Sequence, residues 1–180
     1  MGRTEIELLS TERRDGDRAA TVVEELADLL VDCVEGGASL GFLTGLRRAE
    51  AAQWWQRALA APGSLTLVVR DDGGAVVGAV RLLTDTPANA PHRAEVAKLL
   101  VHRDARGRGR ASALMQALED AAAGLGRTLL TLDTETGSLA ERCYTSWGWE
   151  RVGVIDDYAL TPDGRLAATT LMVKRLPPRP

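Results

Sequence analysis

The sequence predicts a single α/β domain. Three observations predict this class. Apolar residues recur with the period of a strand in some segments and of a helix in others. One long helical segment connects two apolar strand-like runs, as in a crossover between parallel neighbours. The 180 residues suffice for one sizeable core but not for two ordinary domains, so we expect residues 1–180 to form one domain.

The bulk composition argues against several classes of protein. Hydrophobic residues make up 45% of the chain and charged residues 26%, which are globular proportions rather than those of a disordered or fibrous protein. The net charge of -3 argues against a nucleic-acid-binding protein. The chain starts without an apolar signal segment, and no run approaches the length of a membrane span. We therefore expect a cytoplasmic protein with no nucleic-acid or membrane partner.

Cysteine and histidine are too sparse for a structural metal site. The two cysteines, Cys33 and Cys143, lie far apart in helical patterns, and the two histidines, His92 and His102, accompany no Cys-x-x-Cys pair. We expect buried, reduced thiols and no metal.

The first half of the chain alternates strands and helices, with turn residues between them. We expect a strand at 4–9, a polar turn at 15–17 and a helix ending at Gly36-Gly37. A loop at 38–45 and a helix with Trp54-Trp55 in the core should follow. Strands at 65–70 and 75–83 should then form a hairpin through a tight turn at 71–74.

The central segment, residues 95–111, joins a buried strand to a glycine-rich turn and a helix. Strand alternation places Glu95 on the same side as Ala97, Leu99 and Val101. The apolar face of the following helix consists of Ala111, Leu114, Met115, Leu118, Ala122 and Leu125.

The last third contains a strand, a helix and a final pair of strands. The strand at 128–134 should lie parallel to the central one because a long helix connects the two. Ser138 and Glu141 predict a capping box for the next helix, which carries Ala140, Cys143, Tyr144 and Trp147 on one side. We expect the last strands at 150–155 and 169–175, with a loop between them.

The turn Arg106-Gly107-Arg108-Gly109-Arg110-Ala111 has the properties of a phosphate-binding loop. A helix N-terminus offers unpaired N–H donors, glycines allow close approach to the backbone, and guanidinium groups supply further positive charge. The segment is neither a Rossmann fingerprint nor a Walker loop, because the third glycine and the Gly-Lys-Ser/Thr are missing. Taken alone, it could equally be a solvated basic turn.

Two motifs together resemble the GNAT acetyltransferase superfamily. Arg106-x-x-Gly109-x-Ala111 directly after a strand is similar to that superfamily's acyl-CoA motif. Ala140-x-x-x-Tyr144-x-x-x-Gly148-Trp149 is similar to its later helix, with a tyrosine and a closing Gly-aromatic pair. The resemblance implies the GNAT fold, a single mixed, mostly antiparallel sheet flanked by helices, in which two central parallel strands splay apart.

Residues 92–174 are more narrowly similar to the tabtoxin-resistance acetyltransferases. The matching pieces are His92 to Val96, Lys98-Leu99, Ala105 to Gly109, Leu132 to Glu135, Gly137-Ser138 and Pro162 to Leu166. They cover about half of the chain, and the first half matches only in its order of elements.

The resemblance also implies where acetyl-CoA binds. The pantetheine arm would pair with the strand edge exposed by the splay, and the loop would hold the pyrophosphate. The expected contacts are Leu99, Leu100, Val101, Arg106, Gly107, Arg108, Gly109, Arg110 and Ala111.

Acetyl transfer to an amine requires three kinds of group. An alkyl ammonium has a pKa of about 10.4, so a base must take its proton, and Glu95 and Asp133 match acids of the tabtoxin-resistance pattern. A backbone N–H near Leu100 or Val101 would hold the oxyanion, and Tyr144 would protonate the departing thiolate. Structural ion pairs for the acids and plain packing for the tyrosine are the alternatives.

The sequence therefore predicts an acetyl-CoA-dependent N-acetyltransferase acting on a small-molecule amine, with an amino-acid-like toxin or antibiotic as a candidate acceptor. The alternatives are a protein or polyamine acetyltransferase and a non-catalytic acyl-CoA sensor. Asp156, Asp157 and Tyr158 would either close over a cationic acceptor or form a solvated loop. An exposed edge in the last strands is compatible with a homodimer as well as a monomer.

Overall fold

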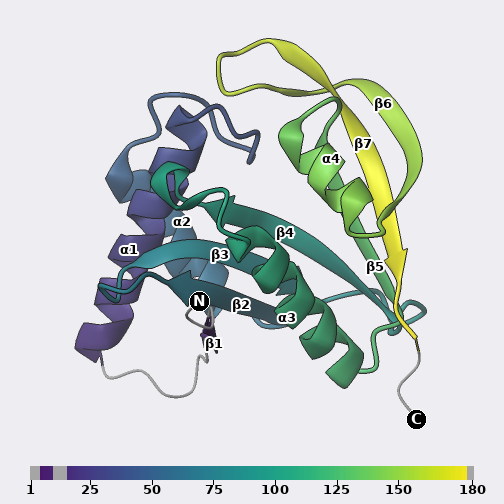
Figure 1. Cartoon of the computed structure of the whole chain (residues 1–180), viewed down its shortest axis with the longest axis horizontal. Coiled ribbons are helices and arrows are strands. Elements are labelled where there is room, and N and C mark those ends of the chain that lie inside the picture. The colour runs from purple at the N-terminus through teal and green to yellow at the C-terminus, as the bar shows by residue number, and fades with distance from the viewer. Residues whose placement is uncertain (1–4, 10–15, 178–180) are drawn as a thin grey trace.

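The computed structural model describes residues 5–9 and 16–177, which form one seven-stranded sheet with flanking helices (Figure 1). The strand order is β1-β2-β3-β4-β5-β7-β6, and only the central β4 and β5 run parallel. This confirms the predicted fold class. The strands are β1 Ile6–Leu8, β2 Ser64–Arg70, β3 Val76–Leu83, β4 Arg93–Val101, β5 Leu129–Glu135, β6 Glu150–Leu160 and β7 Leu166–Arg175.

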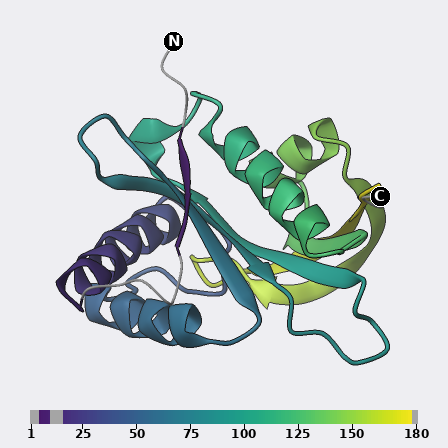
Figure 2. The ribbon, with the colours of Figure 1, turned by 90° about the horizontal axis from the view of Figure 1, so that it is seen from below.

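The helices lie on both faces of the sheet (Figure 2). Helices α1 (Gly16–Glu35) and α2 (Arg48–Ala60) cover one face, and α3 (Arg110–Gly124) and α4 (Leu139–Ser146) the other. The polar turn expected at 15–17 lies partly outside the described residues, and Gly16 already begins α1. A short 3-10 helix, η1 (Arg103–Ala105), follows β4.

Each face of the sheet has its own apolar core. The core under α1 and α2 contains the fully buried Trp55 and Leu100, and Phe42 and Trp54 pack at its margin. The core under α3 and α4 contains Tyr144 and Trp149. Trp55 is therefore core, as predicted, whereas Trp54 is only partly buried and packs against this core.

Strands β4 and β5 separate soon after they begin. They pair only through Arg93 with Leu129, Ala94 with Leu130, and Glu95 with Thr131. Beyond this point β4 continues to Val101 without a partner on its β5 side among the described strands. The expected splay between two central strands is present.

A β-bulge at Lys98 changes which side chains share a face of β4. Lys98 has φ 53, and the register with β3 shifts between Ala79 and Arg81, so two residues of β4 oppose one of β3. Val96 and Leu99 consequently pack on the α3 side, whereas Leu100 packs on the α1 side. The predicted alternation through Glu95, Ala97, Leu99 and Val101 is therefore wrong after Ala97.

The final hairpin is longer than predicted. Strand β6 extends to Leu160, and Asp156, Asp157 and Tyr158 lie inside it rather than in a loop. The register with β7 shifts between Ile155 and Ala159, so these three residues form an irregular bulge, with Asp157 at φ 49. A turn at Pro162-Asp163-Gly164 joins β6 to β7.

Two local predictions about helix ends need correction. Leu125 follows the last residue of α3 and is 51% exposed, so it does not extend the buried face. At α4, the Ser138 hydroxyl accepts from the Glu141 N–H as expected, but the Glu141 carboxylate accepts from Gly137 and Thr170 rather than from the N–H of Ser138.

Across residues 5–9 and 16–177, no helix is long and apolar enough to cross a membrane. The same residues contain no group of three or more His, Cys, Asp or Glu side chains placed to hold a metal ion.

Candidate active site

The turn after β4 presents bare backbone at the N-terminus of α3. Gly107 and Gly109 have φ values of 72° and 73°, a conformation that side-chain-bearing residues rarely adopt. No other atom lies within 4 Å of the position that a Cβ would take at either glycine. The backbone here is therefore open to a ligand, at the positive end of the helix dipole.

The three arginines of this loop differ in the hydrogen bonds that they form. Arg106 Nε donates to the carbonyl oxygen of Val101 at 3.1 Å, and Arg110 donates to that of Ala105 at 3.1 Å. Arg108 is exposed and has no hydrogen bond or ion pair within the described part of the chain. Two of the three guanidinium groups thus shape the loop, and Arg108 is free for a ligand's charge.

The two predicted acids lie on the same face of the sheet, where β4 and β5 part. Glu95 pairs in register with Thr131, two residues before Asp133, and side chains two residues apart on a strand share a face. Both acids are exposed, and neither forms an ion pair with another described residue. The Thr169 hydroxyl donates to Asp133 Oδ2 at 3.1 Å.

Tyr144 is buried on the opposite face. Its ring packs against Trp147 and Trp149 with centroid distances of 5.8 and 5.9 Å. Burial raises the pKa of Tyr144 far above its ordinary value, and the negative charge of Asp133 acts in the same direction. The phenol therefore stays protonated at neutral pH, so it can donate a proton.

Comparison with known proteins decides the family. The model of the GNAT acetyltransferase family matches residues 23–149, which include β4, the glycine loop, β5 and Tyr144. The chain belongs to the GNAT acetyltransferase family. It is therefore an acetyl-CoA-dependent N-acetyltransferase, as the two motifs predicted.

Solved structures share the fold of this GNAT enzyme at low sequence identity. A ribosomal-protein-alanine N-acetyltransferase from Brucella melitensis has a TM-score of 0.74 and 22% identity, covering 96% of this chain and 99% of its own. A phosphinothricin acetyltransferase from Sinorhizobium meliloti in complex with acetyl-CoA has a TM-score of 0.76 and 19% identity, covering 96% and 88%. A putative acetyltransferase from Salmonella typhimurium with acetyl-CoA has a TM-score of 0.74 and 18% identity, covering 99% and 97%.

Helix α1 anchors the start of the glycine loop in this GNAT enzyme. Asp32 accepts hydrogen bonds from the backbone N–H and Nε of Arg103 at 3.0 and 2.8 Å, and His102 Nε2 lies 3.6 Å away. Burial alone would raise the pKa of Asp32, but the backbone and side-chain hydrogen bonds from Arg103 and the positive charge of Arg103 hold it below its ordinary value. Sequence analysis missed Asp32, because no local pattern links it to a loop about 70 residues further on.

Lys98 lies on the same face as the two acids, and sequence analysis did not single it out. Its Nζ is 5.3 Å from the ring centroid of Trp54 and 5.9 Å from that of Phe42. Burial lowers the pKa of Lys98 and the charge of Arg81 lowers it further, whereas Asp133 and Glu95 act in the opposite direction. A lysine in the middle of the apolar run AEVAKLLV was the available signal.

The α1–α2 loop and the β6–β7 turn meet on this face. The N–H of Thr44 donates to the carbonyl oxygen of Pro162 at 2.9 Å, and Pro162 is buried. The α1–α2 loop lies with the β1–β4 half of the split sheet, and the turn belongs to the half made of β5, β7 and β6 (Figure 1). Together they form a lid, defined here as residues 38–47 and 161–165.

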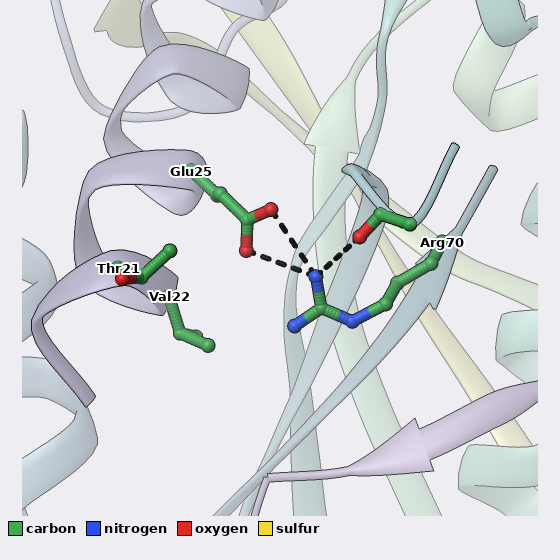
Figure 3. A pocket seen from close by; sticks show the side chains of 5 residues that line it. Thr21, Val22, Glu25 and Arg70 are labelled. Atoms are coloured by element: carbon green, nitrogen blue, oxygen red, sulfur yellow. Dashed lines mark hydrogen bonds and ion pairs between the residues drawn. The ribbon is translucent and has the colours of Figure 1, made fainter. Parts of the chain in front are cut away.

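A separate hollow lies beside the first half of α1 and does not include the site (Figure 3). It is lined by Thr21, Val22, Glu25, Arg70 and Gly74. Arg70 donates to Glu25 at 3.0 Å and to the carbonyl oxygen of Gly74 at 2.7 Å, so its charge is already matched. This contact joins α1 to the β2–β3 turn.

Proposed function

We propose that this GNAT enzyme transfers the acetyl group of acetyl-CoA to the primary amine of a small molecule with amino-acid-like character. One observation carries the proposal: the unpaired edge of β4 runs from Glu95 and Asp133 at the splay to the open backbone of Gly107 and Gly109. This geometry provides a place for an extended pantetheine arm with a diphosphate at one end and an acceptor at the other.

The proposed cofactor contacts follow from this path. Backbone groups of Leu99, Leu100 and Val101 pair with the pantetheine amides along the free edge. The loop from Arg106 to Ala111 binds the diphosphate through its amides, with Arg108 adding positive charge.

The proposed chemistry is direct attack by the amine on the thioester carbonyl. An ammonium with a pKa of about 10.4 must first lose a proton, and Glu95 or Asp133 accepts it, directly or through water. The oxyanion is held by a backbone N–H near Leu100 or Val101, and the carbon–sulfur bond then breaks. Tyr144, whose phenol is protonated at neutral pH, donates its proton to the departing thiolate.

Two observations support a small acceptor. The lid contact between Thr44 and Pro162 lies over the face of the sheet that carries Glu95 and Asp133, called the acceptor face from here on. This contact restricts the room for a polypeptide. The structure from Sinorhizobium meliloti, which shares this fold, is named a phosphinothricin acetyltransferase. We propose membership of the tabtoxin-resistance type on the same basis, with a toxin or antibiotic amine as the substrate.

We also propose a homodimer in the cytoplasm. Strand β6 is an edge strand, and it exposes Val152, Ile155 and Tyr158 by 63%, 42% and 52%. A second copy pairing with this edge would cover apolar surface that a monomer leaves in water. Light scattering after size exclusion tests this, and the mass of a single chain would overturn it. Cys33 and Cys143 are free thiols, which suits a reducing compartment.

The test of function is thiol release from acetyl-CoA in the presence of a panel of amines. Amino acids, polyamines and peptides with free N-termini or lysines are compared with a reaction lacking any amine. We expect amine-dependent release with small amino-acid-like acceptors and N-acetylated products by mass spectrometry. Turnover of peptides alone would replace the small-molecule acceptor with a protein, and binding of acetyl-CoA without any turnover would make the protein a sensor.

A further inference from the structure

Two cations without a carboxylate in contact lie on the acceptor face, Lys98 on β4 and Arg81 on the neighbouring β3. Lys98 Nζ has no hydrogen bond or ion pair within residues 5–9 and 16–177, and its contacts are the faces of Trp54 and Phe42. Arg81 is only 6% exposed, and its guanidinium lies 5.7 Å from the Trp54 ring centroid. Arg81 Nη2 donates to the carbonyl oxygen of Ala58 at 2.5 Å and to Ser64 Oγ at 2.9 Å, but its buried Nε has no partner.

Packing alone does not account for Lys98. An ammonium partly withdrawn from water beside a second cation is unfavourable, and a methionine would fill the same space without that cost. A cation–π contact offsets only about 0.5–2 kcal/mol. The backbone at Lys98 is also held at φ 53, and strained conformations of this kind concentrate at functional sites.

Lys98 lies near the two acids of β4 and β5 and also near the lid. It lies three residues after Glu95 on β4, and the negative charges of Glu95 and Asp133 act on it without contacting it. A Cβ built on Gly41 of the lid would lie 3.9 Å from Lys98 Nζ, so the ammonium lies beneath the lid. The acceptor face therefore has separate negative and positive ends, the acids at the splay and Lys98 under the lid.

We propose that Lys98 binds the carboxylate of an acceptor whose amino group lies at Glu95 and Asp133, which makes the substrate class the amino acids and their close analogues. This inference rests on the proposed function. A zwitterion matches both charges of the face at once, and Arg81 supports Lys98 by adding positive potential from the neighbouring strand β3. Amines that lack an acidic group would leave Lys98 unpaired and be poor acceptors.

The experiment compares wild type with Lys98→Met and the charge-retaining Lys98→Arg. The acceptors are L-amino acids and, for each one acetylated, its carboxamide and its decarboxylated amine. We expect wild type to prefer the acid over the two neutral forms by about tenfold or more in kcat/KM, the size of one charged hydrogen bond. Lys98→Met should abolish this preference mainly through KM, and Lys98→Arg should retain part of it.

Three outcomes would overturn the inference. Wild type could acetylate carboxamides as well as acids, Lys98→Met could lower kcat/KM equally for all three forms, or mass spectrometry could find the acetyl group on Lys98 itself. The last result would make Lys98 an acceptor rather than a binding residue.

A binding measurement separates this inference from the proposed function. Calorimetric titration with the N-acetyl forms of the same amino acids, in the presence of CoA, needs no turnover. Binding to wild type that weakens by about tenfold in Lys98→Met supports the carboxylate site even if no amine is acetylated. Equal binding by both proteins, or binding by neither, rejects the site.

Discussion

The backbone N–H of Thr44 donates to the carbonyl oxygen of Pro162 at 2.9 Å, and this bond joins the two halves of the split sheet. Thr44 belongs to the loop between α1 and α2, and Pro162 to the turn between β6 and β7. Because β4 and β5 part below this point, the contact connects the halves where the sheet itself does not.

Removing this contact should weaken acceptor binding without affecting acetyl-CoA. Thr44→Pro deletes the donating N–H, so we expect the KM for the amine to rise about tenfold, as for one lost hydrogen bond. The matched control is Thr44→Ala, which keeps the N–H and loses only an exposed side chain. Steady-state kinetics with each substrate varied in turn checks the prediction, and a larger KM for acetyl-CoA would contradict it.

Tyr144→Phe should lower kcat by about 100-fold, because general acid catalysis commonly contributes this much. The hydroxyl has no hydrogen-bond partner among the described residues, so the melting temperature should change little. Since burial raises the pKa of Tyr144, the wild-type kcat should not fall on the alkaline side up to about pH 10. Full turnover by Tyr144→Phe would assign the residue to packing.

Gly109→Ala should raise the KM for acetyl-CoA about tenfold, by straining the loop that holds the diphosphate. Gly126→Ala is the matched control, because Gly126 also has φ 73 and open space at the Cβ position but follows the other end of α3. Both variants should lose similar stability in thermal unfolding, and only Gly109→Ala should change KM. Equal kinetics in the two variants would remove Gly109 from the cofactor site.

The sequence was sufficient for the fold and the family because their signals are local. Apolar spacing, the glycines of the loop and the Gly148-Trp149 pair are visible within single segments. The bulges at Lys98 and Asp157 were missed because no glycine marks them, and the register with the neighbouring strand imposes their positive φ.

Contacts between residues far apart in the chain could not be predicted from the sequence either. Asp32 contacts the loop from a helix that precedes it by about 70 residues, and Thr44 contacts Pro162 in a turn near the other end of the chain. Such contacts depend on how the elements assemble, which no spacing in one segment encodes. In the sequence, nothing distinguishes Asp32 from the other polar residues of its amphipathic helix.

The acid pair can be tested by pH dependence. Glu95→Gln with Asp133→Asn should lower kcat/KM by about 100-fold near neutrality, since no group remains to accept the amine proton. The loss should shrink as the pH approaches about 10.4, because free amine then becomes abundant. The single variants identify the base from the larger loss. An unchanged rate in the double variant would refute the role of both acids.

Asp32→Asn should destabilise the protein in a pH-dependent manner. The pKa of Asp32 is lowered in the folded state, so its contribution is fully present above the unfolded value of about 3.9 and is lost as the pH falls through the folded value. We expect Asp32→Asn to lower the free energy of unfolding by about 1 kcal/mol at pH 7, and by less at pH 3. Urea denaturation at both pH values measures the difference.

Asp28→Asn provides the control for Asp32, one turn earlier on α1. Asp28 is 60% exposed and pairs with Arg48 at the surface, so its replacement should change stability little at either pH. If Asp32→Asn behaved like Asp28→Asn, the hydrogen bonds to Arg103 would not anchor the glycine loop. A pH-independent loss in Asp32→Asn would instead indicate a packing defect, because only a titrating carboxylate couples stability to pH.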